Sequence, residues 1–592
     1  MDLRLLLDQP TGTERTAVDD LLGPPDSGWV GGEFTGLDGH IAYGGHEARA
    51  RRHLLLPALH AVQDAVGSVS KGALGYICER LTIPPAEAYG VATFYALFDV
   101  GGRGGPSLHV CDDIVCSQYG AEELCVALDE AGAEYERSPC LGQCDRAPAT
   151  MHHRLGTGYL NAAPVTVENV DTWPSDPLGP GTIHQDPADL TLLRHIGIVD
   201  ADSLDSYLET GGFTTLAKAK DIGAEAVIDE LKRSNLKGRG GAAFPIGIKW
   251  EGVRNASGSP KYVIANGDES EPGTFKDRLL MEGDPFAVVE AMALYGYATG
   301  ADHGFIYVRG EYPVAERRLR SAIARAEAAG LLDEGFALEV RRGAGAYICG
   351  EETALFASIE GHRGEPRQKP PFPTESGVFG KPTGINNIET LLAALHVIEI
   401  GGDVFAAIGT EQSAGPKLFC VSGAVQQPGV YEVEFGTTLG ELLDMAGGVR
   451  SGADLGTVLL GGAAGVFVGA DSLHLPLTFE DTRAAGATLG SGSIVFFDDT
   501  TEFGPVLRRI AQFFRDESCG QCVPCRIGTV RQEEALARLA ADVPLGGIAD
   551  EMQRLDDLAR VMTDASICGL GQTAASAVQS AFGLGLVTGA AR

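Results

Sequence analysis

Two groups of four cysteines constrain this chain more than any other feature. One group has a C-x4-C pair and a C-x3-C pair, and the other has a C-x2-C-x2-C run with one distant cysteine. Close pairs place two thiolates on one loop at little entropic cost, and four converging thiolates are what an iron–sulfur cluster needs. The layout predicts a path for electrons. The groups are Cys111, Cys116, Cys140 and Cys144, and Cys519, Cys522, Cys525 and Cys568.

Zinc is the main competing interpretation of a four-cysteine group, because C-x2-C pairs also suit tetrahedral zinc. The C-x4-C and C-x3-C gaps are unusual for zinc, and the run from Cys519 to Cys525 resembles the run that ferredoxins use for a 4Fe-4S cluster. We therefore favour iron–sulfur clusters in both groups. Cys78 and Cys125 stand among helical apolar residues, which indicates small buried hydrophobes.

The overall charge limits the partners. A formal net charge of −34 argues against nucleic acid and against an anionic membrane, since both require a basic surface. Residues 1–10 do not read as a signal peptide, and no run of about 18 apolar residues occurs. We expect a cytoplasmic protein without direct membrane insertion, in a compartment where disulfides are rare. The length predicts about four domains.

The N-terminal part divides into an arm, a helical segment and a small α/β unit. Residues 1–46 are rich in Gly, Pro and Asp, so they predict a mobile or partner-bound arm, and order should begin with a helix at Glu47. In the α/β unit each expected strand leads into one cysteine pair, which puts both pairs at one end. The expected helices cover 47–67, 71–81, 85–98 and 121–131, and the expected strands cover 107–110 and 135–138.

Two central segments suit a phosphorylated ligand. After an expected helix at 217–233, the segment 237–250 is rich in glycine, so its amides can approach phosphate and Lys249 can add charge. Residues 266–277 follow an apolar run, which places acidic groups at a strand end, where they can hold ribose hydroxyls. Taken alone, the first segment also fits a simple turn and the second a solvated acidic turn.

The segment 342–355 again runs from a strand through glycines into a helix. It departs from the dinucleotide fingerprint at Ile348, where that pattern has glycine or alanine, so an ordinary dinucleotide fold is disfavoured. Segments 369–373 and 381–390 add an aromatic residue, lysines and paired amides. Earlier in the chain, the proline-rich segment 173–187 predicts a linker.

The C-terminal part changes character twice. Residues 416–477 combine short strands with a helix and predict a small β-grasp unit with no evident chemistry. From residue 505 onward the pattern is helical, with helices expected at 505–514, 526–540, 548–562 and 574–582. The second cysteine group lies between and after these helices, so a helical bundle should present all four thiols at one end.

These motifs together resemble a known family. Residues 48–170, with the run IPPAEAYGVATFY at 83–95 and four cysteines, resemble the thioredoxin-like 2Fe-2S subunit of the NADH dehydrogenase module of respiratory complex I. Residues 215–585 resemble the flavin subunit of that module. The two subunits are fused here, which is similar to the diaphorase subunits of NAD-dependent molybdenum or tungsten formate dehydrogenases and of NAD-reducing hydrogenases.

The resemblance implies a multidomain α/β fold. It contains a helical prelude, a thioredoxin-like 2Fe-2S domain, an FMN-binding α/β domain, a small β-grasp domain and a C-terminal helical bundle with a 4Fe-4S cluster. The implied boundaries are 1–46 for the arm, 47–105 for the helical segment, 106–172 for the 2Fe-2S domain, 173–236 for the linker and lead-in helices, 237–415 for the FMN and NAD domain, 416–500 for the β-grasp domain and 501–592 for the bundle.

Cofactor-binding residues are also implied by the resemblance. FMN would use Gly238, Arg239, Gly240, Lys249, Asn266, Asp268, Gly350, Glu351, Asn386 and Asn387. NAD would stack on the flavin with Phe244 and Phe372 flanking adenine, and Glu271, Tyr347, Glu352 and Lys369 would place the rest. Glu352 and Glu271 are the candidates for catalytic residues. The chain departs from the family pattern at Ala243, where glycine is usual, and at Gly252, where complex I often has an aromatic residue.

The resemblance further implies a multisubunit enzyme. Segments 513–534 and 247–250 are most similar to formate dehydrogenase diaphorases, which predicts a catalytic alpha subunit carrying molybdopterin and further Fe-S clusters. A NAD-reducing hydrogenase is the second interpretation, and a fused subunit of complex I is the third. The alternative from another class is a non-enzymatic Fe-S scaffold that has lost its nucleotide. Intact Glu271, Glu352 and lysines argue against that scaffold.

Overall fold

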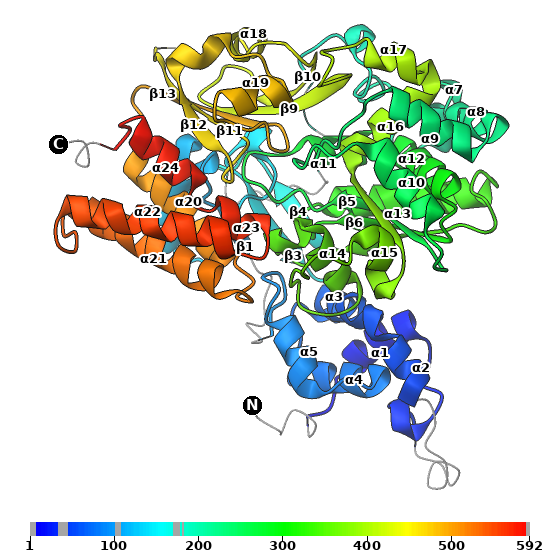
Figure 1. The fold of residues 1–592 in the computed structure, drawn as a ribbon. Coiled ribbons are helices and arrows are strands. Elements are labelled where there is room, and N and C mark those ends of the chain that lie inside the picture. Colours follow the sequence, from blue (N-terminus) through cyan, green and yellow to red (C-terminus); the bar gives the residue numbers. More distant parts are fainter. Residues whose placement is uncertain are drawn as a thin grey trace.

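The computed structural model describes residues 8–33, 45–100, 108–169, 178–179, 181, 183–450 and 452–587. Figure 1 shows the N-terminal helices in blue projecting from a larger body, which combines the central domain in green, the mixed sheet in yellow and the C-terminal helices in orange and red. The prediction of a multidomain α/β protein is confirmed.

Five helices form the N-terminal group. The expectation that residues 1–46 lack regular structure is wrong for the helix α1, which begins after Thr11 with a capping box to Glu14. Only Val18 and Leu22 of this helix are buried apolar residues, so its periodic signal is weak, and packing on α3 and α4 holds it in place. The helices are α1 (Gly12–Leu22), α2 (Gly45–Ala50), α3 (Leu55–Val66), α4 (Lys71–Leu81) and α5 (Pro85–Ala92).

Helix α5 ends earlier than expected, at Ala92 instead of residue 98. The chain beyond it pairs with a distant loop: Ala96 N donates to Gly345 O at 3.1 Å and Leu97 N donates to Ala344 O at 3.0 Å. These bonds take the amides that a longer helix would use. The helical segment is thereby joined to a glycine-rich loop of the central domain.

The first cysteine group lies in a four-stranded mixed sheet of order β2-β1-β3-β4. β1 and β2 are parallel, and the other neighbours are antiparallel. The elements are β1 (Leu108–Cys111), α6 (Ala121–Glu130), β2 (Glu136–Ser138), β3 (Thr150–Arg154) and β4 (Gly158–Ala162). Because β1 and β2 run in the same direction, both cysteine pairs follow the same edge of the sheet, as predicted.

Residues 173–177, 180 and 182 of the expected linker 173–187 fall outside the described residues. Its final part is ordered against the mixed sheet, since Gln185 Nε2 donates to Glu432 O at 2.7 Å and Gln185 Oε1 accepts from Glu432 N at 2.7 Å. The Gln185 side chain thus pairs with the backbone of that sheet as a neighbouring residue would. This end of the segment therefore has a fixed course.

The central domain contains an all-parallel sheet of order β7-β6-β5-β8. Helices cover it on both sides (Figure 1), and ligands of such sheets bind beyond the carboxyl ends of the strands. The strands are β5 (Tyr262–Gly267), β6 (His303–Val308), β7 (Ala337–Arg342) and β8 (Thr383–Asn387). The helices are α7 (Leu204–Glu209), α8 (Thr214–Ile222), α9 (Ala224–Arg233), α10 (Ile246–Asn255), α11 (Lys276–Gly283), α12 (Pro285–Thr299), α13 (Pro313–Ala328), α14 (Glu352–Ile359), α15 (Pro373–Ser376), α16 (Ile388–Ile400) and α17 (Gly402–Ala406).

The single helix expected at 217–233 is two helices, α8 and α9. They meet at Gly223, whose φ of +91° lies in a region that ends a right-handed helix. The apolar period continues across the break, because both helices pack on α12 and α16. The sequence pattern therefore does not reveal the interruption.

A five-stranded mixed sheet of order β10-β9-β13-β11-β12 follows. Its core of Phe419, Val421, Leu439 and Leu442 is separate from the main core. The strands expected within 416–477 are found in β9 and β10. The elements are β9 (Pro416–Gly423), β10 (Gly429–Glu434), α18 (Leu439–Met445), β11 (Leu455–Leu460), β12 (Val466–Gly469), α19 (Phe479–Ala484) and β13 (Ser493–Asp498).

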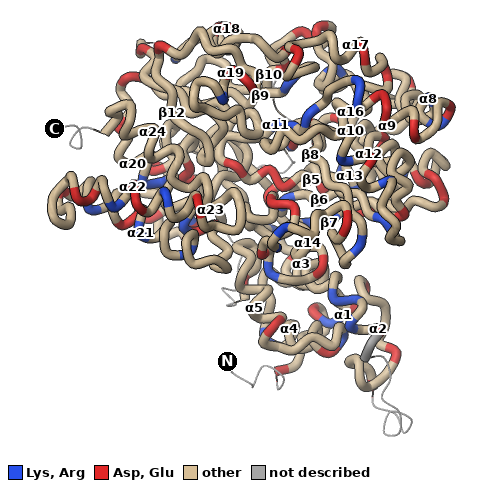
Figure 2. Tube along the Cα trace, in the orientation of Figure 1, with Lys and Arg blue, Asp and Glu red and all other residues tan. Residues whose placement is uncertain are grey.

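The C-terminal helices form the predicted bundle. In the view of Figure 2, basic and acidic residues are interspersed along α21 and α22. None of the helices among the described residues combines the length and apolar character needed to cross a membrane. The helices are α20 (Phe503–Asp516), α21 (Val523–Ala540), α22 (Ile548–Ala565), α23 (Gly569–Thr573) and α24 (Ser576–Gly583).

Candidate functional site

The four thiols of the first cysteine group come together at the end of β1 and β2. Cys111 ends β1, Cys116 begins a short 3-10 helix, Cys140 follows β2 and Cys144 begins a second 3-10 helix. All four are buried. Cys140 Sγ lies 3.3 Å from Cys144 Sγ, and Cys111 is hydrogen-bonded to both Cys116 and Cys140. The structure therefore unites four residues that span two loops.

The loop around Cys140 is held by hydrogen bonds. Asp113 accepts from Ile114 N at 2.7 Å and from Cys140 N at 3.0 Å, and Gly142 N donates to Cys140 Sγ at 3.4 Å. Hydrogen bonds from Cys111 and Cys144 lower the pKa of Cys140. Four soft sulfur atoms gathered at one place suit an iron–sulfur cluster. Across the described part of the chain, no three His, Cys, Asp or Glu side chains form a site for one metal ion.

The second cysteine group also converges. Cys519 and Cys522 lie between α20 and α21, Cys525 is in the first turn of α21, and Cys568 precedes α23, and all four line one small cavity. Burial raises the pKa of Cys525 to about 12 and that of Cys568 to about 11. A bound iron would offset this cost, because ligation favours the thiolate.

Backbone amides support this second group. The amides of Leu570 and Gly571 hydrogen-bond Cys568, which lowers its pKa against the effect of burial. A Cβ at Gly571 would lie 2.9 Å from Cys525 Cβ, so only glycine permits this approach. The site therefore has amides directed at a ligand sulfur, as iron–sulfur sites do.

A cavity of about 480 Å³ opens beyond the carboxyl ends of the parallel strands. Its volume is in the range of small-molecule and cofactor sites. Half of the sixteen predicted FMN and NAD residues line it. They are Gly240, Asn266, Asp268, Glu271, Tyr347, Gly350, Glu351 and Asn387. The three central segments singled out in the sequence thus meet at one site.

The wall of this cavity leaves one buried acceptor free. Asn266 Nδ2 donates to Gly350 O at 2.9 Å, and Asn266 Oδ1 accepts from Asp268 N at 3.1 Å. Asp268 Oδ2 is buried without a hydrogen-bond partner, and burial raises the pKa of Asp268 well above its usual value. A Cβ at Gly350 would lie 3.4 Å from that oxygen. An unpaired acceptor beside bare backbone fits the hydroxyl groups of FMN.

Glu271 and Tyr347 form a partly buried pair at the cavity. Tyr347 Oη donates to Glu271 Oε2 at 2.5 Å, and Ala464 N donates to Glu271 Oε1 at 2.8 Å. Burial raises the pKa of Glu271 to about 7. Tyr347 N donates to Glu517 Oε2 at 2.8 Å, and burial raises the pKa of Glu517 to about 7 as well. Two carboxyl groups with raised pKa values thus face one tyrosine.

The β-grasp unit has a part in this site, so the expectation that it lacks evident chemistry is wrong. Loops of this unit line part of the cavity, and the sequence gives no signal for them beyond glycine-containing turns. By contrast, four further lining residues lie inside the acidic segment 266–277. The missed residues are Gly461, Ala464, Thr488, Gly490 and Ser491 from the β-grasp unit, Glu269, Ser270, Thr274 and Asp277 from the acidic segment, Gly241, Ala242 and Ile348 from the two glycine-rich segments, and Gly569, Leu570 and Thr573 from the bundle.

Some predicted residues lie behind the cavity instead of lining it. Gly238 N donates to Phe244 O at 2.9 Å, which closes the glycine loop on itself. The Arg239 guanidinium is buried, donates to Ala414 O at 2.6 Å and stacks on Phe435. Asn386 Oδ1 accepts from Trp250 Nε1 at 3.0 Å. In this structure these side chains support the loop.

The remaining predicted residues form an open rim. Phe244 and Phe372 are 47% and 55% exposed. Lys369 Nζ lies 2.5 Å from Glu352 Oε1 and 3.0 Å from Glu351 Oε1. Because Glu351 also lines the cavity, this rim is continuous with it. Exposed rings beside an ion pair suit a nucleotide that arrives from solvent.

The two departures from the family pattern have different structural settings. Ala243 adopts φ +50°, a conformation that favours glycine, which explains why glycine is usual there. Lys249 is partly buried and donates to Ile385 O at 3.0 Å, and burial lowers its pKa. At Gly252 an added Cβ would make ordinary contact with Thr374. Neither departure removes a residue from the cavity.

Buried charges behind the cavity were missed by sequence reasoning. Lys276 Nζ lies 2.8 Å from Asp277 Oδ1 and 3.1 Å from Glu389 Oε2. Asn387 Nδ2 donates to Asp277 Oδ2 at 2.5 Å. Burial lowers the pKa of Lys276, but the two carboxylates outweigh burial and raise it overall. This network fixes the orientation of Asn387, which lines the cavity.

The cavity beyond the parallel strands and the second cysteine group share a wall. Ile348 and Leu570 line both cavities. Ile348 belongs to the glycine-rich segment of the central domain, and Leu570 belongs to the bundle. A single layer of side chains therefore separates the two sites, which suits electron transfer between them.

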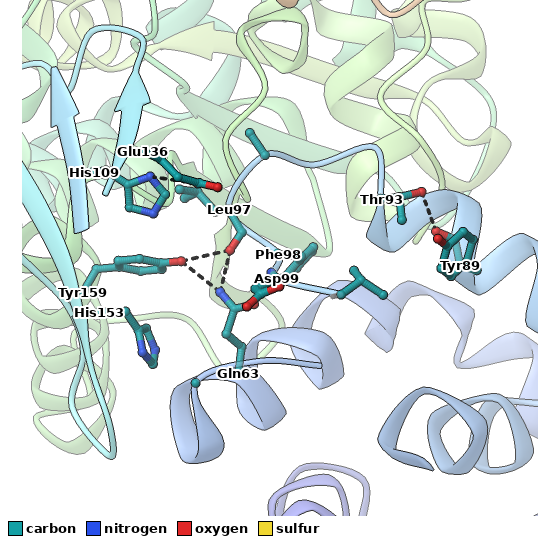
Figure 3. Close-up of a pocket in the computed structure, with 13 residues that line it drawn as sticks. Gln63, Tyr89, Thr93, Leu97, Phe98, Asp99, His109, Glu136, His153 and Tyr159 are labelled. Atoms are coloured by element: carbon teal, nitrogen blue, oxygen red, sulfur yellow. Dashed lines mark hydrogen bonds and ion pairs between the residues drawn. The ribbon is translucent and has the colours of Figure 1, made fainter. Parts of the chain in front are cut away.

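A separate cavity of about 290 Å³ lies between the N-terminal helices and the first sheet (Figure 3). The side chains of Gln63 and Tyr159 point toward Leu97 O, to which Tyr159 Oη donates at 2.9 Å. These bonds join α3 to β4. The described residues that line this cavity include none of the predicted site residues, so we assign it to the interface between the two segments.

The fold and these sites define a flavin and iron–sulfur electron-transfer protein. Family profiles match in the same order along the chain. The thioredoxin-like [2Fe-2S] ferredoxin matches residues 43–170, the Nuo51 FMN-binding domain 231–396, the SLBB domain 418–463, and the NADH-ubiquinone oxidoreductase-F iron-sulfur binding region 505–583.

Individual relatives agree with the profiles. An F-type NADH-quinone oxidoreductase protein of Rhizobium meliloti (strain 1021) is 42% identical over 400 residues, which are 66% of this chain and 94% of that protein. The alpha subunit of the NAD-reducing hydrogenase HoxS of Cupriavidus necator is 34% identical over 89% of each chain. A chain of a NAD+-reducing [NiFe]-hydrogenase in the air-oxidized state is similar with a TM-score of 0.77, at 31% identity over 90% of this chain and 92% of that one.

The chain therefore belongs to the family of the F-type NADH-quinone oxidoreductase subunits and the diaphorase subunits of NAD-reducing hydrogenases. Its cofactors are FMN, a 2Fe-2S cluster and a 4Fe-4S cluster, and its substrate is NAD(H). It is an NADH-oxidising subunit of a larger assembly, which confirms the predicted diaphorase function.

Proposed function

We propose that this chain is the NAD(H)-exchanging subunit of a formate dehydrogenase, whose catalytic subunit carries molybdopterin and further Fe-S clusters. The observation that carries the electron-transfer part is the shared wall of Ile348 and Leu570 between the flavin cavity and the second cysteine group. The choice of formate is supported by the resemblance of segments 513–534 and 247–250 to formate dehydrogenase diaphorases.

The two cysteine groups are proposed as the cluster ligands. Cys111, Cys116, Cys140 and Cys144 would hold the 2Fe-2S cluster, and Cys519, Cys522, Cys525 and Cys568 the 4Fe-4S cluster. This assignment is supported by the convergence of each group at one site and by the match of each region to a cluster-binding family.

The residues of the cavity have distinct proposed roles. When bound, FMN supplies the conversion between the hydride of NADH and single electrons for the clusters. Asp268 accepts hydrogen bonds from the hydroxyl groups of FMN. Asn266 holds the Gly350 carbonyl so that the backbone faces the ligand. Hydride transfer needs two rings held face to face, which is positioning work.

The rim positions the nucleotide. Phe244 and Phe372 present exposed faces on which adenine can stack. Lys369 neutralises Glu351 and Glu352, so the ion pair can reorganise when a phosphorylated ligand enters. Tyr347 and Glu271 hold polar groups of the nucleotide next to the flavin.

A second candidate is the corresponding subunit of a NAD-reducing hydrogenase. It is favoured by similarity over nearly the whole chain, because the hydrogenase HoxS alpha subunit aligns over 89% of both proteins. The two candidates share every residue of the NAD, FMN and cluster sites, and they differ in the partner subunit.

The test uses the native complex purified through this chain under anaerobic conditions. NAD+ reduction is followed with formate in one cuvette and hydrogen in another. NADH formation with formate supports the proposal, and formation with hydrogen alone supports the hydrogenase. Silence in both, with NADH still reducing dyes, indicates a complex I-like partner. The Cys522→Ala complex is the matched control, because it should lose formate-dependent NADH formation while NADH still reduces the flavin.

A further inference from the structure

One buried arginine joins the first cysteine group to the flavin cavity. Arg309 follows β6, and its side chain is 3% exposed. Arg309 Nη2 donates to Cys140 O at 2.8 Å, and Arg309 Nη1 donates to Glu269 O at 2.8 Å. Cys140 lies on the cluster loop and Glu269 lines the flavin cavity. The two loops belong to different domains, so one guanidinium spans the domain boundary.

The same place carries a second, independent contact. A Cβ at Gly142 would lie 2.2 Å from Tyr312 Oη, so the cluster loop packs directly on the tyrosine ring. Tyr312 Oη also donates to Glu269 O at 3.3 Å and to Glu269 Oε2 at 3.2 Å. Arg309 and Tyr312 therefore both contact the cluster loop and the flavin loop. These two residues therefore fix the position of the Cys140 loop relative to the Glu269 loop.

The charge of Arg309 is balanced by one carboxylate. Glu311 Oε1 lies 2.8 Å from Arg309 Nη2, and Glu311 Oε2 accepts from Arg309 Nε at 3.1 Å. Both side chains are nearly inaccessible to solvent. Charges in such a place are weakly screened, so removal of either partner leaves an uncompensated charge beside Cys140.

We propose that Arg309 is a positioning residue for electron exchange between the flavin and the 2Fe-2S cluster. It fixes the Cys140 loop against the flavin loop, and with Glu311 it sets the reduction potential of that cluster. The inference rests on the proposed assignment of Cys140 as a ligand. In this step one electron would pass from the reduced flavin to the cluster, which gains one negative charge, and no bond to the cluster is formed or broken.

The sign of each effect follows from electrostatics. Reduction adds negative charge, so a nearby positive charge favours the reduced cluster and a negative one disfavours it. Arg309→Met leaves Glu311 uncompensated and should lower the potential. Glu311→Gln leaves Arg309 uncompensated and should raise it. The double variant restores neutrality, so its potential should return toward that of the native protein although the link between the loops is lost.

The experiment is an EPR-monitored redox titration of the holo complex carrying each variant. We expect Arg309→Met to lower the equilibrium constant for reduction of the 2Fe-2S cluster at least tenfold. For a one-electron couple this lowers the reduction potential by about 59 mV. Glu311→Gln should shift it in the opposite direction. The 4Fe-4S potential and the FMN content should stay at native values. Unchanged 2Fe-2S potentials in both single variants would overturn the proposal.

Positioning is tested separately from charge. Freeze-quench EPR after NADH addition measures how fast the 2Fe-2S signal appears. Arg309→Lys keeps the charge but its ammonium cannot span both carbonyls, so we expect a near-native potential with slower reduction of the cluster. Native reduction rates in Arg309→Lys and in the double variant would exclude the positioning role.

Two further outcomes separate this inference from the ligand assignment. If Arg309→Met fails to assemble, the opposite shift expected for Glu311→Gln decides the question. Cys140→Ala should abolish the 2Fe-2S signal, and a retained signal would overturn the ligand set. A native 2Fe-2S signal whose potential ignores Arg309 and Glu311 would overturn the role of Arg309 alone.

Discussion

Tyr347 Oη donates to Glu271 Oε2 at 2.5 Å inside the flavin cavity. Tyr347 comes from the glycine-rich segment after β7, and Glu271 comes from the acidic segment after β5. Burial raises the pKa of Glu271, and the hydrogen bond from Tyr347 opposes that rise. The charge of one cavity residue is therefore controlled by the other.

Replacement of Tyr347 by Phe removes that hydrogen bond. The pKa of Glu271, about 7 in the native protein, should rise further, because burial is then less opposed. If NADH oxidation depends on ionised Glu271, the pH profile of kcat/KM with NADH and a dye should move to higher pH. Glu271→Gln is the control, since it should remove this titration from the profile. A pH profile that matches the native one in both variants would contradict a role for Tyr347 and Glu271.

Replacement of Glu352 by Gln weakens the rim ion pair. Lys369 then keeps Glu351 as its carboxylate partner and should shift toward the cavity wall. We expect flavin reduction by NADH to slow about tenfold with FMN still bound, because a small misplacement of the reacting rings is costly. Stopped-flow absorbance measures this rate. The control is Asp403→Asn, an exposed acid of α17, and an unchanged rate for Glu352→Gln would refute the role.

Replacement of Phe372 by Ala removes an exposed ring at the rim. Aromatic stacking contributes about 1 kcal/mol, so KM for NADH should rise about fivefold with FMN content unchanged. Steady-state kinetics with a dye acceptor measure the change. Phe379→Ala is the matched control, because Phe379 is partly exposed but packs on His53 and Tyr262. Equal effects in the two variants would count against adenine stacking on Phe372.

Replacement of Cys522 by Ala removes one thiol from the cavity that all four cysteines of the bundle line. We expect the 4Fe-4S EPR signal to disappear, while NADH still reduces the flavin. The residues that form the flavin cavity lie on the other side of Ile348 and Leu570. Cys78→Ala, a buried cysteine of α4, is the control. A complete set of reduced-cluster signals in Cys522→Ala would disprove the ligand assignment.

Replacement of Glu282 by Gln tests a buried carboxyl group outside the site. Burial raises the pKa of Glu282 to about 7, so its native state keeps a proton that the unfolded chain releases at lower pH. The group therefore contributes stability below its unfolded pKa, and this contribution is lost as the pH rises through 7. Glu282→Gln should raise the free energy of unfolding by about 2 kcal/mol at pH 8.5 and change it little at pH 5. Thermal melts of both proteins measure the stability change at each pH. An equal change at pH 8.5 and at pH 5 would contradict the prediction.

The sequence by itself determined the cofactors and most of the elements. Cysteine spacing predicted both cluster sites, because thiols three to five positions apart lie close together on one loop before any tertiary contact forms. The segments 266–277 and 342–355 predicted where the cavity forms, since parallel strands bring their carboxyl ends to one edge. Helical periodicity gave α4, α6 and α22 to within a few residues.

Only the tertiary structure decided what depends on contacts between distant segments. Helix α1 carries two buried apolar residues and is held by packing, and α5 stops where Leu97 N pairs with Ala344 O. The β-grasp loops around Ala464 and Ser491 have no chemical signature, yet they line part of the flavin cavity. Arg309 reads in the sequence as one more surface charge. The fold buries it between Cys140 O and Glu269 O, because only the packed domains bring those two carbonyls within reach of one side chain.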